Sequence, residues 1–359
     1  MSSVWNNKIS VSVFGEAQSS AIGVTVNNLP SGEYIDHKAV KKFMSRINTG
    51  NRRENVMPHV ISGTYNGRTT GAPLCAFIQN YSPEPLSDNN NLDRLARCGH
   101  ADYTGAVRYK GFNDVRDSGH FSERLTVPIC FAGAVCGQIL ERRGIYTGAH
   151  IARIHKINDN PFDPINLSRD HILSIRNKDF PVINDRKGWL MSEEIDRIYK
   201  KGDSIGGIIE CAVVNLPAGI GSPIFDGLEN TIAQLIFGLP FVTGIEFGAG
   251  FRSAMMTGSL YNDDFYVDEH GHVLTETNNH GGILGGISSG MPVVFRVALR
   301  PNPSIAKEQK TIDLHELKEK NFSSGKEYDP CTVIRAVPCV EAVTNIAILT
   351  HMMEYPNFC

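Results

Sequence analysis

The stretch NNHGGILGGISSGMPVVFRVALRPNPS, residues 278–304, contains two Gly-Gly pairs around an Ile-Leu step and an apolar run that leads into Arg300. Glycine adopts positive φ angles and lets backbone N–H groups approach a ligand closely. Two interpretations stay open: a cradle for a phosphate or a flat ring system, and a hairpin turn before a buried strand. The spacing fits neither GxGxxG nor a Walker A motif, so a Rossmann or P-loop assignment is excluded.

The same order of elements occurs twice along the chain. An apolar, strand-like segment at 11–27 is followed by the turn NLPSG at 28–32 and by a helix with Asp36 as its N-cap. A second strand, IIECAVV at 208–214, is followed by the turn NLPAG at 215–219 and by a helix from about residue 225. This repetition predicts one α+β domain over residues 1–359, with pseudo-twofold halves at about 9–150 and 200–353.

Other segments have simpler readings. Residues 127–142 are apolar nearly all round, which predicts a buried helix, and residues 336–353 predict a second helix rich in Ala, Val and Ile. Residues 74–78 predict a buried strand after a hairpin-like segment at 60–73. The polar residues 81–93 predict a surface loop, and residues 158–187, which alternate charge and proline, are expected outside the core.

Composition describes an ordinary globular protein, with 41% hydrophobic residues, 20% charged residues and a net charge of -3. Basic residues form no long run, so we expect no nucleic-acid partner. We also expect neither a signal peptide nor a membrane span, because no uninterrupted apolar run approaches the roughly 20 residues that a span needs. The eight cysteines form no CxxC pair, which favours reduced thiols in the cytoplasm and no metal site.

Three short clusters carry residues suited to chemistry. RCGHADY at 97–103 places His100 beside an arginine and a carboxylate, and histidine, which titrates near neutrality, can act as a general acid. GHFSER at 119–124 precedes the apolar helix, whose first N–H groups can meet an anion. YDPC at 328–331 is followed by Arg335. Each cluster also has a structural reading, as a hydrogen-bonded histidine or a helix-entry turn.

A set of ordered stretches spans residue 14 to about residue 353: FGEAQSSAIG, NNLPSG, RRE at 52–54, ISGTYNGRTTGAPL, RCGHADYT, YKGFND, GHFSERLT, DSIGG, NLPAGIGSPIFD, NNHGGILGGISSGMP, RPNPSI and DPCTVIRAVPCVEA. Together they resemble the chorismate synthase family over nearly the whole chain. The GHFS form is similar to that of clostridial-type members. The resemblance implies that family's α+β fold, with internally duplicated β-α units and antiparallel sheets packed against helices.

The resemblance also implies an activity. Members are FMN-dependent lyases, usually homotetramers, that remove phosphate from 5-enolpyruvylshikimate 3-phosphate by a 1,4-anti elimination. The product is chorismate, a precursor in aromatic amino-acid biosynthesis. The flavin must be reduced although the reaction has no net redox change, and NADPH is a candidate reductant. The implied partner is thus a small phosphorylated molecule.

Motif positions imply a role for each site residue. His100 corresponds to the family's second catalytic histidine, near the leaving phosphate. Asp329 corresponds to the carboxylate that works with flavin N5 in removing the C6 proton. Four arginines correspond to substrate-binding positions: Arg46, Arg52, Arg124 and Arg335. Seven residues correspond to FMN-binding positions: His120, Phe121, Ser122, Gly285, Arg300, Asn302 and Ser304.

The chain departs from the family pattern at several of these motifs. Gln18 stands where G-E-S-H-G carries the first catalytic histidine, and glutamine cannot act as an acid. The segment after Arg46 is shortened and has lost at least one phosphate-facing arginine. Glu327 replaces the arginine of R-H-D-P, and Asp117-Ser118 replaces a Gly-Gly pair. General acid–base groups contribute ~10²–10⁴-fold, so the loss at position 18 predicts slow turnover rather than none.

The four departures share a direction, because each removes a cation or an acid, or adds an anion, at a site for an anionic substrate. Two readings of the activity follow. In one, the chain is a divergent chorismate synthase. In the other, it is a paralogue with weakened, lost or altered lyase activity. A third, non-enzymatic option is a flavin-binding or assembly subunit.

Overall fold

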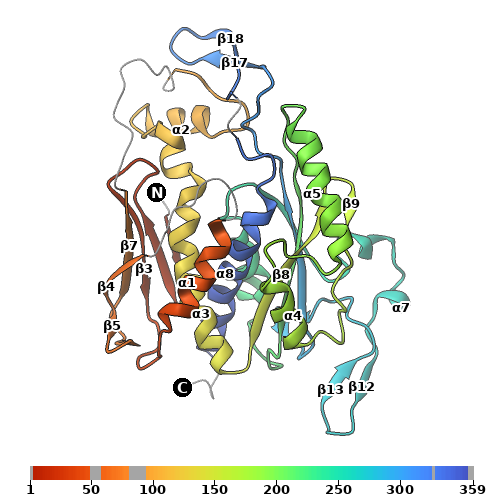
Figure 1. Cartoon of the computed structure of the whole chain (residues 1–359). Coiled ribbons are helices and arrows are strands. Elements are labelled where there is room, and N and C mark those ends of the chain that lie inside the picture. Colours follow the sequence, from red (N-terminus) through yellow and green to blue (C-terminus); the bar gives the residue numbers. More distant parts are fainter. Residues whose placement is uncertain (1–2, 49–57, 81–93, 326–327, 355–359) are drawn as a thin grey trace.

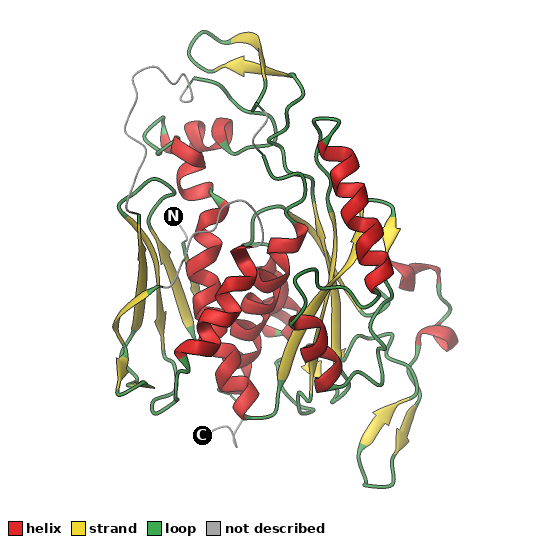
Figure 2. Cartoon of the chain, in the orientation of Figure 1, coloured by secondary structure: helices red, strands yellow, loops and turns green. Residues whose placement is uncertain are grey.

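Two five-stranded antiparallel sheets enclose a central layer of helices (Figures 1 and 2). The computed structural model describes residues 3–48, 58–80, 94–325 and 328–354. A mixed architecture of antiparallel sheets and helices confirms the predicted α+β class. The predicted surface loop at 81–93 lies outside the described residues.

The first sheet has the strand order β1-β2-β3-β7-β4. Its strands are β1 (Val4–Asn6), β2 (Ser10–Phe14), β3 (Ala21–Asn27), β7 (Leu74–Gln79) and β4 (His59–Ser62). Its inner face buries Val24, Leu74 and Ala76 completely or nearly so. A small hairpin of β5 (Thr64–Tyr65) and β6 (Arg68–Thr69) confirms the turn predicted within 60–73.

The second sheet has the strand order β11-β16-β10-β8-β9. Its strands are β11 (Val242–Phe247), β16 (Val293–Leu299), β10 (Gly207–Val214), β8 (Tyr146–Ile154) and β9 (Ile157–Asn158). Strands β10 and β16 are mostly apolar, apart from Glu210 and Arg296, as expected for a sheet covered on both faces. On the outer face lie α4 (Arg169–Arg176) and α5 (Asp185–Tyr199) (Figure 1). The segment 158–187 therefore lies on the outside, as expected, but it also buries Phe162 and Ile172 in a small core shared with β10 and β16.

The central layer contains α1 (His37–Ser45), α3 (Thr126–Arg142), α6 (Leu228–Ile236) and α8 (Val333–Met352). Helices α3 and α8 touch closely, since a Cβ on Gly133 would lie 2.4 Å from Ala342. By length and composition both could span a membrane, but 83% of the most apolar window of α8 and 61% of that of the stretch 116–142 are buried. We interpret them as core helices, whose all-round apolar character reflects burial between the two sheets.

The two NLPxG turns have the same backbone signature. Asn28 and Asn215 both have positive φ angles, of 63° and 61°, and Gly32 and Gly219 have φ angles of 83° and 94°. Asn tolerates this left-handed conformation better than most residues. Asp36 caps α1 through hydrogen bonds to two backbone N–H groups, as predicted. The division into pseudo-twofold halves stays a prediction that these matching turns support.

The glycine-rich stretch at 278–304 forms a hairpin before a buried strand. Strands β14 (Ile283–Leu284) and β15 (Ile287–Ser288) pair across the turn at Gly285 and Gly286, and β16 follows. The hairpin interpretation is therefore confirmed.

The remaining elements connect these layers or project from them. They are η1 (Arg46–Asn48), α2 (Asp102–Tyr109), η3 (Arg116–Phe121), η4 (Glu123–Leu125), η5 (Ile224–Asp226), η6 (Gly250–Met255), α7 (Gly258–Tyr261), β12 (Phe265–Val267), β13 (Val273–Thr275), β17 (Gln309–Asp313) and β18 (Lys318–Phe322).

Candidate active site

An ion pair fixes the loop that carries His100. The Arg97 guanidinium contacts both oxygens of Asp102, at 2.8 and 2.9 Å, and the Arg97 backbone N–H donates to the same carboxylate at 3.0 Å. Gly99 has a φ angle of 71°, and a Cβ there would lie 2.6 Å from the Cβ of Pro303. The loop can therefore lie against the segment 300–304 because residue 99 is glycine.

His100 is half-buried against that segment, and its Nε2 lies 3.0 Å from the Ser304 hydroxyl. Burial and the charges of Arg97 and Arg300, opposed by Asp102, together lower the pKa of His100 to about 4. At this pKa the imidazole is uncharged at neutral pH, whereas the sequence alone predicted titration near neutrality. A bound anion favours the protonated form, so His100 can become a proton donor once a phosphate lies beside it.

Asp329 lies in the same neighbourhood because Asn302 connects the two segments. The Asn302 side-chain amide donates to the Asp329 carbonyl at 2.9 Å, and its oxygen accepts the Ser304 backbone N–H at 3.1 Å. One oxygen of the Asp329 carboxylate accepts the Cys331 N–H at 3.0 Å, and the other contacts Arg335 at 2.6 Å. A continuous set of contacts thus joins His100, Ser304, Asn302, Asp329 and Arg335.

The motif GHFSER reaches this set through Glu123, whose carboxylate contacts the Arg335 guanidinium at 3.0 Å. Arg335 is largely buried, and although burial opposes its charge, Glu123 and Asp329 raise its pKa. In the same motif Arg124 donates to the Ala17 carbonyl at 2.9 Å. The motif therefore also lies beside the segment of Gln18, which is 8% exposed.

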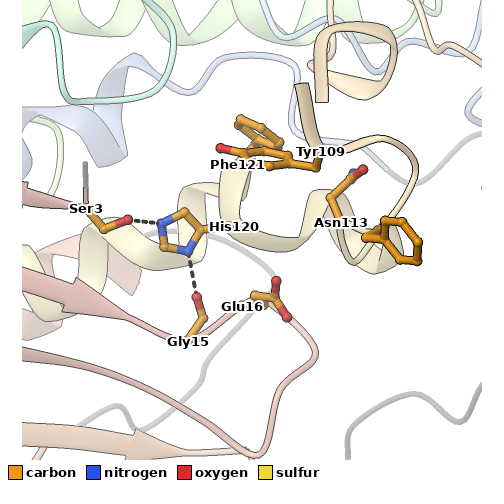
Figure 3. A pocket seen from close by; sticks show the side chains of 8 residues that line it. Ser3, Gly15, Glu16, Tyr109, Asn113, His120 and Phe121 are labelled. Atoms are coloured by element: carbon orange, nitrogen blue, oxygen red, sulfur yellow. Dashed lines mark hydrogen bonds between the residues drawn. The ribbon is translucent and has the colours of Figure 1, made fainter. Parts of the chain in front are cut away.

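A cavity of about 540 Å³ is lined by the GHFSER motif, by Gly15 and Glu16, and by residues at the end of α2 and after it. His100, Asp329 and Arg335 are not among its lining residues. Figure 3 shows His120 at its wall, held by the Gly15 carbonyl at 2.8 Å and the Ser3 hydroxyl at 2.5 Å. The carbonyl fixes Nδ1 as a donor. The rings of Tyr109 and Phe121 form a tilted pair with centroids 6.3 Å apart. Both the volume and the aromatic lining suit a small-molecule ligand.

Two of the predicted site residues lie apart from this cluster. Gly285 lies in the β14–β15 turn, where its neighbour Gly286 lies against Ser222 and Gly227, whereas Arg300 directly follows the end of β16. The Arg46 guanidinium pairs with Glu341 of α8 at 2.5 and 2.9 Å. Substrate binding by Arg46 stays a prediction, but in the structure its charge already has a buried carboxylate as partner.

Two further residues named from the sequence, Arg52 and Glu327, lie outside the described residues. Ser122 is buried, and its hydroxyl accepts the Arg124 N–H as a helix cap. Cysteines 75, 98, 130, 136, 211, 331 and 339 are free thiols, as expected, and no group of metal-binding side chains occurs in the described part of the chain.

Sequence reasoning missed two features of the site. Glu123 was present in the motif GHFSER, but nothing in the motif shows that its carboxylate meets Arg335, 212 positions later in the chain. Tyr109 and Asn113 line the cavity together with Glu16. The run YKGFND contains two of them, and its mixture of aromatic and amide side chains beside GHFSER is the signal that could have found them.

Comparison with known proteins identifies the family. The chorismate synthase family model matches residues 9–353. The chain is 38% identical over 352 residues to a chorismate synthase of Thermococcus kodakarensis, covering 96% of both chains. It is 35% identical over 373 residues to one of Lancefieldella parvula, covering 99% of this chain and 98% of the relative.

A solved structure, the crystal structure of a chorismate synthase, superposes with a TM-score of 0.78 at 23% identity, covering 97% of this chain and 93% of that one. At that identity the likeness shows the fold, and it confirms the predicted fold class. The family match and the full-length relatives, taken with the convergence of the three motifs, show that this chain belongs to the chorismate synthase family, a family of carbon–oxygen lyases.

Proposed function

We propose that the protein is an FMN-dependent chorismate synthase that eliminates phosphate from 5-enolpyruvylshikimate 3-phosphate in the cytoplasm, in aromatic amino-acid biosynthesis. The observation that carries the proposal is the set of contacts from His100 to Arg335. Three motifs that lie far apart in the sequence meet there, and they bring a histidine, a carboxylate and an arginine to one place.

Each residue of this set has a role that follows from its chemistry. Asp329 would work with the flavin in removing the C6 proton of the substrate, and its carboxylate is oriented by the Cys331 N–H and by Arg335. His100 serves the leaving phosphate, because the incoming anion raises the pKa of a histidine that burial otherwise keeps neutral. Arg335 holds the negative charge of the substrate near Asp329.

The residues around the site fit a flavin nucleotide. Arg300 has no acidic partner among the described residues, and its guanidinium stacks on the Phe241 ring with 5.1 Å to the centroid. It can hold the phosphate of FMN together with Asn302 and Ser304. The cavity lined by His120 and Phe121 has aromatic walls for a flat ring. When bound, reduced FMN would lend an electron transiently to the substrate. NADPH is the proposed source of the reduced flavin.

A homotetramer is part of the proposal. Gly285 lies in the β14–β15 turn that precedes β16, and Arg300 directly follows β16. A second copy of the chain that supplies Gly285 to a flavin held at Arg300 would give this assembly a role in the site.

The competing reading is a paralogue with lost or altered activity, and the neutral Gln18 favours it. One assay separates the two: purified protein with chemically reduced FMN and 5-enolpyruvylshikimate 3-phosphate, without oxygen, followed by the absorbance of chorismate. Formation of chorismate within ~10²-fold of an ordinary kcat of about 10 s⁻¹ supports the proposal. Binding of FMN without product supports the paralogue, and failure to bind FMN leaves a role without flavin chemistry.

A further inference from the structure

Arg335 is shared by two carboxylates yet has an unsatisfied donor. Its Nη2 contacts Glu123 at 3.0 Å and Asp329 at 2.6 Å. Its Nε is buried without a hydrogen-bond partner among the described residues. A buried N–H without an acceptor is costly. The Nε edge of Arg335 therefore favours an acceptor that these residues do not supply.

The two carboxylates are not held equally. Asp329 is fixed by the Cys331 N–H as well as by Arg335. Glu123 lies in the short η4 turn at the entrance to α3, and its side chain is 35% exposed. It can turn toward solvent without leaving a buried charge behind. Glu123 is therefore the partner that Arg335 can release.

We propose that Glu123 is an internal competitor of the anionic substrate for Arg335 and thereby sets the affinity of the site for that substrate. The inference rests on the proposed function. A carboxylate or phosphate can place two oxygens against Nε and Nη2 of a guanidinium, in the bidentate geometry that arginine favours. Binding then exchanges Glu123 for the ligand, satisfies Nε and leaves Asp329 in place.

The exchange makes Glu123 a specificity-determining residue. With Glu123 and Asp329 both present, two negative charges face one guanidinium, so a ligand must displace Glu123 before it meets Arg335. A ligand that can present only one oxygen would replace the Glu123 contact without satisfying Nε. The site therefore discriminates in favour of bidentate anions.

The test compares Glu123→Gln, Glu123→Asp and the wild-type protein. Glu123→Gln keeps the size of the side chain and removes its charge, so KM for 5-enolpyruvylshikimate 3-phosphate should fall by about threefold, the scale of a partly exposed ion pair. Glu123→Asp should stay close to wild type because it keeps the charge. The effect should fall on KM rather than on kcat.

The matched control is Glu141→Gln. Glu141 lies at the other end of α3, pairs with Arg176 at 2.6 Å and is 37% exposed, so it resembles Glu123 in all but location. KM should not change in this variant. If Glu123→Gln leaves KM unchanged or raises it, the inference is wrong.

A second readout separates this inference from the proposed function. Binding of inorganic phosphate, measured by calorimetry, needs no catalysis. If the wild-type protein makes no chorismate, the proposed function fails, yet tighter phosphate binding by Glu123→Gln would still support competition at Arg335. The competition inference is wrong if Glu123→Gln has the same melting temperature as the wild-type protein but binds phosphate no more tightly.

Discussion

At the scale of single residues, burial of His100 makes stability depend on pH. The pKa of His100 is about 4 in the folded chain, and an unperturbed histidine has a pKa of about 6.5. Between these values the unfolded chain binds the extra proton, so this part of the stability is complete above pH 6.5 and is lost as the pH falls toward 4. The loss is about 3 kcal/mol at most.

Replacing His100 with Asn should remove the part of the pH-dependent stability that comes from this histidine. Urea unfolding of the wild-type protein and of His100→Asn, each at pH 5 and pH 7.5, gives the comparison. The free energy of unfolding should fall less for the variant on going to pH 5. Equal losses for the two proteins would show that His100 is not buried as a neutral ring.

Replacing Gln18 with His should raise the catalytic rate rather than lower it. Gln18 is buried. The backbone N–H of its neighbour Ala17 donates a hydrogen bond to the Gly119 carbonyl, and the Ala17 carbonyl accepts one from Arg124, so a side chain at position 18 is held close to the motif GHFSER. Gln18→His would restore an acid where the family pattern has one. Because such groups contribute ~10²–10⁴-fold, we expect kcat for chorismate formation to rise about tenfold or more. Gln18→Asn is the control, and equal rates for the two variants would contradict the expectation.

At the scale of elements, an ion pair between Arg46 and Glu341 connects η1 to the buried middle of α8. Glu341 is fully buried, and although burial opposes its charge, Arg46 and Arg176 hold its pKa below the usual value. Breaking a buried pair leaves an uncompensated charge, so Arg46→Met should lower the free energy of unfolding by about 3 kcal/mol. Denaturant unfolding measures this loss.

The control for this prediction is Arg142→Met. Arg142 pairs with Glu33 at 2.7 Å but is 37% exposed, so its replacement should cost less than about 1 kcal/mol. If Arg46→Met instead raises KM and leaves stability unchanged, Arg46 binds substrate, as the family resemblance implied.

Local chemistry explains which elements were predictable from the sequence. The NLPxG turns, the Asp36 cap and the apolar helices each follow from residues that are neighbours in the chain. Two properties do not: the pKa of His100 depends on how deeply the loop is buried, and the pairing of Glu123 with Arg335 depends on how α3 meets α8. Cofactor binding by Gly285 stays a prediction, because the motif alone does not show how the β14–β15 turn lies relative to the other predicted cofactor residues.

At the scale of the whole molecule, the hairpin β12–β13 projects away from the two sheets (Figure 1). All three residues of β12, Phe265, Tyr266 and Val267, are exposed. A two-stranded hairpin is marginally stable alone, and exposed apolar patches mark interaction sites. We expect a second copy of the chain to cover this hairpin, in agreement with the proposed homotetramer.

The separation of Gly285 from Arg300 along β16 has a genetic consequence. If flavin is held between copies, Gly285→Val and Arg300→Ala would each abolish activity alone, but co-expression of the two should restore part of it. A mixed assembly contains some sites that draw both intact residues from different chains. Such complementation in a strain that requires aromatic amino acids would reveal shared sites through growth, whereas its absence would confine each site to one chain.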